Sequence, residues 1–575
     1  MGSEAVASTA QAPVRRSRAV ALMASGTIVS RVLGFVRTAL LAIAIGSVTS
    51  VADIFEKSNT VPTIIFMLLA GGVFNVVLVP QLIKASKAAD RGSSYTSKLM
   101  TLTVVVMALA TLALTLAAPF IIKALSSGWN DQFLALGTVF TYWCMPQVFF
   151  YGLYAVMGQV LNAHGRFGAY MWAPVANNVV QLLLLGVYIV VFGAYHGAPS
   201  TQLAEWSTAQ TVLLAGGATL GIVVQALVLI VPLRRMGLRL RADFSWHGIG
   251  LKHVGKMAAW TLGAMIIGNL TNLYFGKLAS AATQARTSLG AEAATAPGEA
   301  ALNISQLITV LPHSIFALSL ATVLFNELTH AFADRRGDEV GPLLNKGLRT
   351  TAVPIMFFTV GFIVLAGPLG RLFGGTSPSA IDSGASIAML IVLSALGLPA
   401  KSYTFFLLRT FYAQEDTRTP MLIQSAYAVL GLVLASIAVA VMRPIDIAYG
   451  LATIYAITNV AQALIAHFAV TRRLGSYGAG RVIETYVRIG WLAVISGVVG
   501  AVVLGLLGGF SFGFAWHSYG SAILSILLAG GALGITYLVL LRFARVSELE
   551  DFMGPLARRI PGGGKPSSGG KRRRP

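Results

Sequence analysis

The sequence of 575 residues is poor in charge and contains a single cysteine, Cys144. One cysteine excludes an internal disulfide framework and a metal cluster held by several thiolates. Charged residues make up 11% of the chain, whereas a soluble domain carries about 25%. So few charges cannot cover the water-facing surface of a chain this long, and a soluble multidomain protein is therefore excluded.

Motifs of common enzymes are also missing. The chain has no HExxH zinc motif and no GxSxG nucleophile turn, and its eight histidines show no ligand spacing. Residues Gly250–Lys256 (GLKHVGK) imitate part of a phosphate-binding loop, but Met257 stands where that motif needs Ser or Thr. We therefore predict a protein that is not an enzyme, with no catalytic residue, no metal site and no bound cofactor.

Long apolar runs dominate what is present. Apolar residues make up 56% of the sequence, and the mean hydropathy is +0.75. A helix needs about 20 apolar residues to cross the hydrocarbon core, and barrel strands are far shorter. The pattern predicts an all-α polytopic membrane protein with 14 transmembrane helices. These are expected near 19–47, 58–83, 99–122, 132–161, 171–193, 208–233, 254–280, 302–330, 347–366, 384–411, 421–442, 447–470, 485–508 and 519–541.

The positions of the positive charges predict the orientation. The net charge is +21, which in a soluble protein would suggest nucleic acid, but in a membrane protein the placement of Lys and Arg matters more. With the N-terminus inside, 33 of the 42 Lys and Arg fall in or beside the segments facing the cytoplasm. We therefore predict a multi-pass protein of the bacterial plasma membrane with both termini cytoplasmic. Its expected partners include membrane lipids and no nucleic acid.

The chain resembles itself at an offset of about 250 residues. Residues 61–66 (VPTIIF) align with 311–316 (LPHSIF), and the end of the fourth predicted helix aligns with the end of the tenth. Six helices separate the copies, so the two halves insert with the same orientation, related by a pseudo-two-fold axis along the membrane normal. The alternative is chance similarity between apolar segments.

This repeat predicts two six-helix lobes with a transport site between them, plus two extra C-terminal helices. The expected parts are a disordered cytoplasmic N-terminal tail (1–18), an N-lobe (19–233), a basic cytoplasmic connector (234–253), a C-lobe (254–470), the extra pair of helices (485–541) and a basic cytoplasmic tail (546–575).

Two arginines inside the first apolar run are the most informative residues. Arg31 lies 13 residues after Arg18, about 20 Å along a helix, which is too deep for easy snorkelling. A deep arginine costs from about 2.5 to over 10 kcal/mol unless it faces water or an anion. Arg37 follows six residues later, and guanidinium groups bind phosphate through two parallel hydrogen bonds. We predict that both arginines face an anionic substrate; the alternative is a structural pair with a buried carboxylate such as Asp53.

Three further charged residues are weaker predictions for the same site. Asp53 and Lys57 open the second helix, together with Glu56, where acids also interact favourably with the helix dipole. That simpler reading is favoured for Glu56 and Lys57. Lys401 lies deep in the tenth predicted helix, where facing a cavity and snorkelling are equally plausible.

These motifs resemble the MurJ (MviN) lipid II flippase family, within the multidrug/oligosaccharidyl-lipid/polysaccharide exporter superfamily. The resemblance spans roughly residues 19–545, and the first-helix octapeptide is its most specific part. The matching segments are SRVLGFVR (30–37), Asp53, Val61–Pro62 leading to 72–74 and 79–80, GQVLNAHGRFGAYMWAP (158–174) and FYAQEDTRTP (411–420).

The resemblance implies a function. Members move lipid-linked peptidoglycan precursor from the inner to the outer leaflet by alternating access, for cell-wall synthesis and cell shape. The family's first-helix arginines correspond to Arg31 and Arg37, and its second-helix aspartate corresponds to Asp53. The extra helices would form a groove for the lipid tail. The energy source would be the membrane potential or a monovalent ion, and cell-wall synthesis or division proteins are further expected partners.

The chain also departs from the family pattern. Phe66 and Met67 stand where many members carry a basic pair, and Thr38 replaces an acid that often follows the second arginine. The cavity is therefore predicted to be less positive. A drug or polysaccharide-lipid exporter of the same superfamily is the alternative function, and a non-transporting scaffold is another. Scarce deep acids argue against a cation-coupled drug exporter, and a scaffold would not explain deep arginines.

Overall fold

The computed structural model describes residues 13–68, 92–197, 205–238, 240–245 and 256–557, with the single positions 82, 85, 90, 202 and 203. Within these residues the secondary structure is helical and no β-strand occurs, which confirms the all-α prediction. Twelve helices are long and apolar enough to cross a membrane. The predicted count of fourteen is not confirmed, because the helices at 50–68 and 256–279 are not among those twelve.

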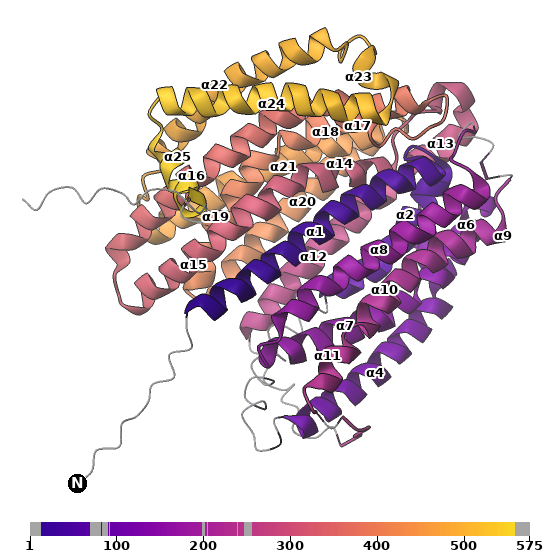
Figure 1. Cartoon of the computed structure of the whole chain (residues 1–575), viewed down its shortest axis with the longest axis horizontal. Coiled ribbons are helices and arrows are strands. Elements are labelled where there is room, and N and C mark those ends of the chain that lie inside the picture. The colour runs from indigo at the N-terminus through magenta and orange to yellow at the C-terminus, as the bar shows by residue number, and fades with distance from the viewer. Residues whose placement is uncertain are drawn as a thin grey trace, which may run out of the picture. The chain divides into compact units, whose positions relative to one another are not determined.

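Figure 1 shows the helices of the structure. In chain order they are α1 (Pro13–Ile45), α2 (Ser50–Leu68), α4 (Ser93–Leu116), α5 (Ala118–Leu125), α6 (Asp131–Cys144), α7 (Pro146–Ala163), α8 (Phe167–Phe192), α9 (Thr208–Thr211), η2 (Val212–Gly216), α10 (Gly217–Leu227), α11 (Ile230–Arg235), α12 (Lys256–Ala279), α13 (Ala281–Leu289), η4 (Gly290–Ala293), α14 (Glu299–Pro312), η5 (His313–Ala317), α15 (Leu318–Ala333), α16 (Gly337–Val364), α17 (Ala366–Arg371), α18 (Ala380–Ala395), α19 (Leu398–Ala413), α20 (Arg418–Val441), α21 (Ile447–Leu474), α22 (Ala479–Leu506), α23 (Phe514–His517), α24 (Tyr519–Phe543) and α25 (Ser547–Ala557).

Local sequence explains where several helices begin. The Asn130 side chain accepts a hydrogen bond from the backbone N–H of Phe133 at 2.9 Å and caps α6. Ser518 and Ser521 form a reciprocal capping box at the start of α24. Pro146 opens α7, where its missing N–H costs nothing.

Contacts divide the chain into two compact units, each described by itself. Unit 1 comprises Met1–Leu307, Gly367–Leu393 and Asp416–Thr458, and unit 2 comprises Ile308–Ala366, Ser394–Glu415 and Asn459–Pro575. In unit 1, α1 packs on α8, α8 on α10, and α2 on α6. In unit 2, α16 packs on α22, and α22 lies beside α24 (Figure 1). The predicted lobes and their pseudo-two-fold stay a prediction.

Large apolar side chains cover the outer faces of many helices. Val190 on α8, Leu506 on α22 and Phe543 on α24 are more than four-fifths exposed. Because soluble proteins rarely leave such extensive apolar surface in water, these faces fit a lipid environment.

Three predicted boundaries differ from the structure. Helix α1 begins at Pro13, so residues 13–18 of the predicted disordered tail are helical. Helix α2 begins at Ser50 rather than near 58, and Thr49 caps it by accepting a hydrogen bond from the Ala52 N–H at 3.1 Å. Hydropathy alone hides this first part because it carries charges, which the fold neutralises as described below. Residues 547–557, expected within the basic tail, form the helix α25, whose first turn is acidic. Residues 558–575 and the tail 1–12 lie outside the described residues.

Candidate anion-facing site

Asp53 lies in a buried ion pair on α2, and its carboxylate is surrounded by protein donors. Its Oδ2 accepts hydrogen bonds from Arg286 Nη1 at 2.8 Å and from Thr283 Oγ1 at 2.9 Å, and its Oδ1 accepts from the Ala300 N–H at 2.9 Å. The Arg286 guanidinium also donates to the Ala296 carbonyl from Nε and Nη2. Both side chains are almost fully buried. This arrangement fastens α2 to the segment that joins α12 and α14.

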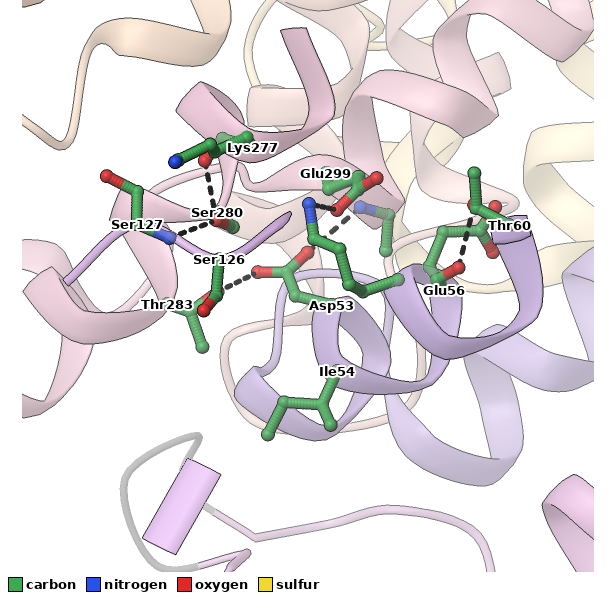
Figure 2. A network of polar contacts seen from close by, with 12 residues as sticks. Asp53, Ile54, Glu56, Thr60, Ser126, Ser127, Lys277, Ser280, Thr283 and Glu299 are labelled. Carbon is green, nitrogen blue, oxygen red and sulfur yellow. Dashed lines mark hydrogen bonds and ion pairs between the residues drawn. The ribbon is translucent and has the colours of Figure 1, made fainter. Parts of the chain in front are cut away.

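A second buried pair lies one helical turn further along α2. Lys57 Nζ is 2.5 Å from Glu299 Oε2, and the two side chains are 1% and 4% exposed. Figure 2 shows Asp53 and Glu56 on α2 with Thr283 and Glu299 nearby. Removing either partner of such a pair would leave an uncompensated buried charge. In this structure Asp53 and Lys57 therefore contact protein charges and do not line the cavity described next.

The cavity lies within unit 1, among α1, α2, α8, α10 and α14, and has a volume of about 290 Å³. Apolar side chains form much of its wall. Its polar lining consists of one cation, one carboxylate, three carboxamides and three hydroxyls: Arg37, Glu56, Asn59, Asn303, Gln181, Thr38, Ser47 and Thr63.

Arg37 supplies the positive charge of this cavity. Its Nη1 donates a hydrogen bond to Gln181 Oε1 on α8 at 3.2 Å. Gln181 is held in turn, since its Nε2 donates to Asn177 Oδ1 at 2.6 Å and Asn177 Nδ2 donates to Gln225 Oε1 at 2.9 Å. Among the described residues no carboxylate lies within 4.0 Å of Arg37. A guanidinium has five N–H donors, so most of its capacity is free to bind an anion in the cavity.

Glu56 lies on the same cavity, and sequence reasoning missed it. Its Oε1 accepts a hydrogen bond from Asn303 Nδ2 on α14 at 3.0 Å. Each charged group of the cavity is thus held by a neutral carboxamide. Such a site can bind a polar headgroup that combines an anion with hydrogen-bond donors.

Arg31 lies on α1 outside the lining of this cavity. It is half-buried, and within the described part of the chain it forms no ion pair. The neighbouring Ser30 is fixed to α8, because Asn178 Nδ2 donates to the Ser30 carbonyl at 2.9 Å. The predicted alternative, a pair between one of these arginines and Asp53, is not formed, since Asp53 pairs with Arg286.

The structure also describes Lys401, the remaining predicted site residue. It lies on α19 in unit 2, where it is half-buried, whereas Arg31, Arg37, Asp53 and Lys57 lie in unit 1. No sequence pattern indicates that Arg286 and Glu299 pair with α2. They lie 233 and 242 residues beyond Asp53 and Lys57, and neither forms a recognisable motif.

An all-helical chain with many membrane-length helices and an unpaired cation at a polar cavity defines a class, the multi-span membrane transporters. A solved structure described as an inward-facing MATE family multidrug resistance transporter of the MOP superfamily covers 78% of this chain and 95% of its own, with a TM-score of 0.63 and 16% identity. That likeness shows the fold alone.

The family is more specific. The family described as "Lipid II flippase MurJ" matches residues 41–524, and the chain belongs to this family of integral membrane proteins. A probable lipid II flippase MurJ of Rhizobium meliloti (strain 1021) is 25% identical over 496 residues, which cover 84% of this chain and 85% of the relative. The solved structure of a lipid II flippase MurJ in an inward closed conformation covers 91% of this chain and 99% of its own, with a TM-score of 0.68 and 17% identity.

Proposed function

We propose that this chain moves lipid II, the undecaprenyl-pyrophosphate-linked peptidoglycan precursor, from the cytoplasmic to the outer leaflet of the bacterial plasma membrane by alternating access. One observation carries this proposal beyond family membership. Arg37 lies on a helix long and apolar enough to span a membrane, lines a polar cavity and, among the described residues, forms no ion pair within 4.0 Å and one hydrogen bond, to the neutral Gln181. A cation kept unpaired at that depth is costly unless it meets an anion.

The chemistry of the cavity fits the polar part of such a lipid. Guanidinium donors match the oxygens of a pyrophosphate, and the carboxamides and hydroxyls offer hydrogen bonds to sugar groups. A volume of about 290 Å³ is too small for a whole disaccharide-pentapeptide, so this cavity would hold the phosphate end. The undecaprenyl tail would stay in lipid, along the apolar helices α22 and α24.

Orientation and energy source belong to the same proposal. Both termini would lie in the cytoplasm, which the bias of Lys and Arg supports. The membrane potential, at about 2.3 kcal/mol per charge per 100 mV, or a monovalent ion would drive the cycle. Further partners would be proteins of cell-wall synthesis or division.

Depletion of this protein in its own host tests the function. Lipid II should become inaccessible to a probe added outside intact cells, while total lipid II persists or accumulates. Re-expression of the wild-type chain should restore access, whereas an Arg37→Ala variant present at equal level should not. Unchanged access after full depletion would contradict the proposal.

A further inference from the structure

Unit 2 contains a basic pocket that the proposed transport path does not use. It has a volume of about 490 Å³ and lies where α16, the start of α22 and α25 meet. Its cations are Lys346 and Arg349 on α16 and Arg481 on α22. A smaller pocket of about 190 Å³ adjoins it and shares Arg349 and Arg481. Positive charge from two helices therefore converges on one hollow.

The anions that face these cations come from one short helix at the end of the described chain. Glu548 on α25 pairs with Arg349, and its side chain is 8% exposed. One turn further along α25, Asp551 Oδ1 lies 3.1 Å from Lys346 Nζ. Thr485 on α22 also fixes the Arg349 side chain, because Arg349 Nε donates a hydrogen bond to Thr485 Oγ1 at 3.1 Å. Two carboxylates of α25 thus occupy the positions where a bound anion would meet the cations.

The carboxylates of α25 do not balance the pocket. Arg481 is exposed and forms no ion pair with any residue that the structure describes. The wall beside it is firmly built, since Asn345 Nδ2 donates to the carbonyls of Tyr477 and Gly478 at 3.0 and 2.8 Å. A third cation on a fixed wall leaves room for a ligand with more negative charge than the two carboxylates supply.

A separate apolar pocket lies further along α16 and is also lined by α25. It has a volume of about 260 Å³, and its lining includes Val353 and Phe357 on α16 and Leu549 and Phe552 on α25. Within about one helical turn the surface of α16 changes from cationic at Arg349 to apolar at Val353. The change from a cationic to an apolar surface along α16 is complementary to an amphiphile with an anionic head.

We propose that the basic pocket binds the phosphate of an anionic membrane lipid, with Glu548 and Asp551 of α25 as its intramolecular competitor. Arginine and lysine donors match phosphate oxygens, and the Glu548 and Asp551 carboxylates give way to the headgroup while the apolar side of α25 stays in contact with the lipid. The charge bias predicts that this end of α16 and α22 faces the cytoplasm, where the leaflet carries anionic lipids. The proposal does not depend on the identity of the transported lipid.

Retention of lipid by the purified full-length chain, measured by native mass spectrometry, tests the site. Phosphatidylglycerol should be retained in preference to phosphatidylcholine. The Arg481→Gln variant should lower phosphatidylglycerol retention about tenfold, the loss of one charge-assisted hydrogen bond. Arg472→Gln removes an equally exposed cation outside the pocket and should leave retention unchanged. Equal retention by the wild-type and Arg481→Gln proteins would overturn the proposal.

The competitor is tested separately. Glu548→Gln combined with Asp551→Asn should raise phosphatidylglycerol retention several-fold, because the two carboxylates no longer compete with the phosphate for the cations. Inorganic phosphate at millimolar concentration distinguishes the source of the anion. Displacement of the lipid by phosphate would support a site for phosphate from either source, and no displacement would support a lipid site. Loss of retention in the double variant would overturn the role of α25.

Discussion

Charged residues within the helices are accommodated in two different ways. Asp53 and Lys57 are neutralised by Arg286 and Glu299 and excluded from solvent. Arg37 instead lines a cavity together with Glu56, and its hydrogen bond is to the Gln181 amide rather than to a carboxylate. The first arrangement keeps the charges out of solvent and suits a structural role. The second leaves a cation in the cavity that is available to bind a ligand. This contrast is why we assign ligand binding to the arginine rather than to the aspartate.

The amide that holds Arg37 provides a sharp test. Replacing Gln181 by Glu places a carboxylate against the guanidinium, so the cation is neutralised within the protein. We expect Gln181→Glu to abolish lipid II exposure on the cell surface. Gln181→Leu removes the hydrogen bonds to Arg37 and Asn177 without adding a charge, and should reduce lipid II exposure by about tenfold or less. Equal activity of the Gln181→Glu and wild-type proteins at matched levels would contradict a role for Arg37 as an available cation.

The buried pair of Asp53 makes a prediction about stability. Asp53→Asn leaves Arg286 charged and uncompensated, which should destabilise the protein by about 3–5 kcal/mol. The matched control is Glu292→Gln, which breaks an exposed pair with Arg443 and should cost about 1 kcal/mol or less. Thermal unfolding in detergent compares the two. Similar midpoints for both variants would show that the Asp53 pair is not structural.

At the scale of elements, the connection from α13 to α14 is fitted closely to α2. A side chain at Gly298 would overlap the Asp53 carboxylate. We therefore expect Gly298→Ala to displace that carboxylate from Arg286 and to lower the unfolding midpoint by several degrees. Gly186→Ala on α8 meets no atom within 4 Å and should be neutral or slightly stabilising. A neutral Gly298→Ala variant would mean that α2 and this connection are not packed as described.

Helix existence could be predicted from sequence, but the partners of the charges could not. Apolar runs of membrane length mark nearly every helix, because in lipid a segment outside a closed barrel must be helical to satisfy its backbone hydrogen bonds. Hydropathy predicts the start of α2 too late, because Asp53, Glu56 and Lys57 lower its value there. These charged side chains can be buried only because partners far along the chain meet them. Sequence alone favours a helix-dipole role for Glu56, because Asn303, its hydrogen-bond partner at 3.0 Å, lies 247 residues away.

At the scale of the whole molecule, the distribution of Lys and Arg predicts the orientation in the membrane. Cys144 is the only cysteine and is buried, so its replacement gives a simple background for labelling. Ser511→Cys should react with a membrane-impermeant maleimide in intact cells. Ala333→Cys should react only after permeabilisation. Both positions are exposed in the structure. The reverse pattern would invert the orientation and would place the proposed phosphate site at the outer leaflet.

The most direct test of the central claim is transport of lipid II by the purified chain in liposomes. Wild-type protein should carry labelled lipid II between leaflets, and Arg31→Ala and Arg37→Ala should each stop it although the proteins remain folded. Arg443→Ala, at an exposed position outside the cavity, should transport normally. Undiminished transport by a protein lacking both Arg31 and Arg37 would contradict the account.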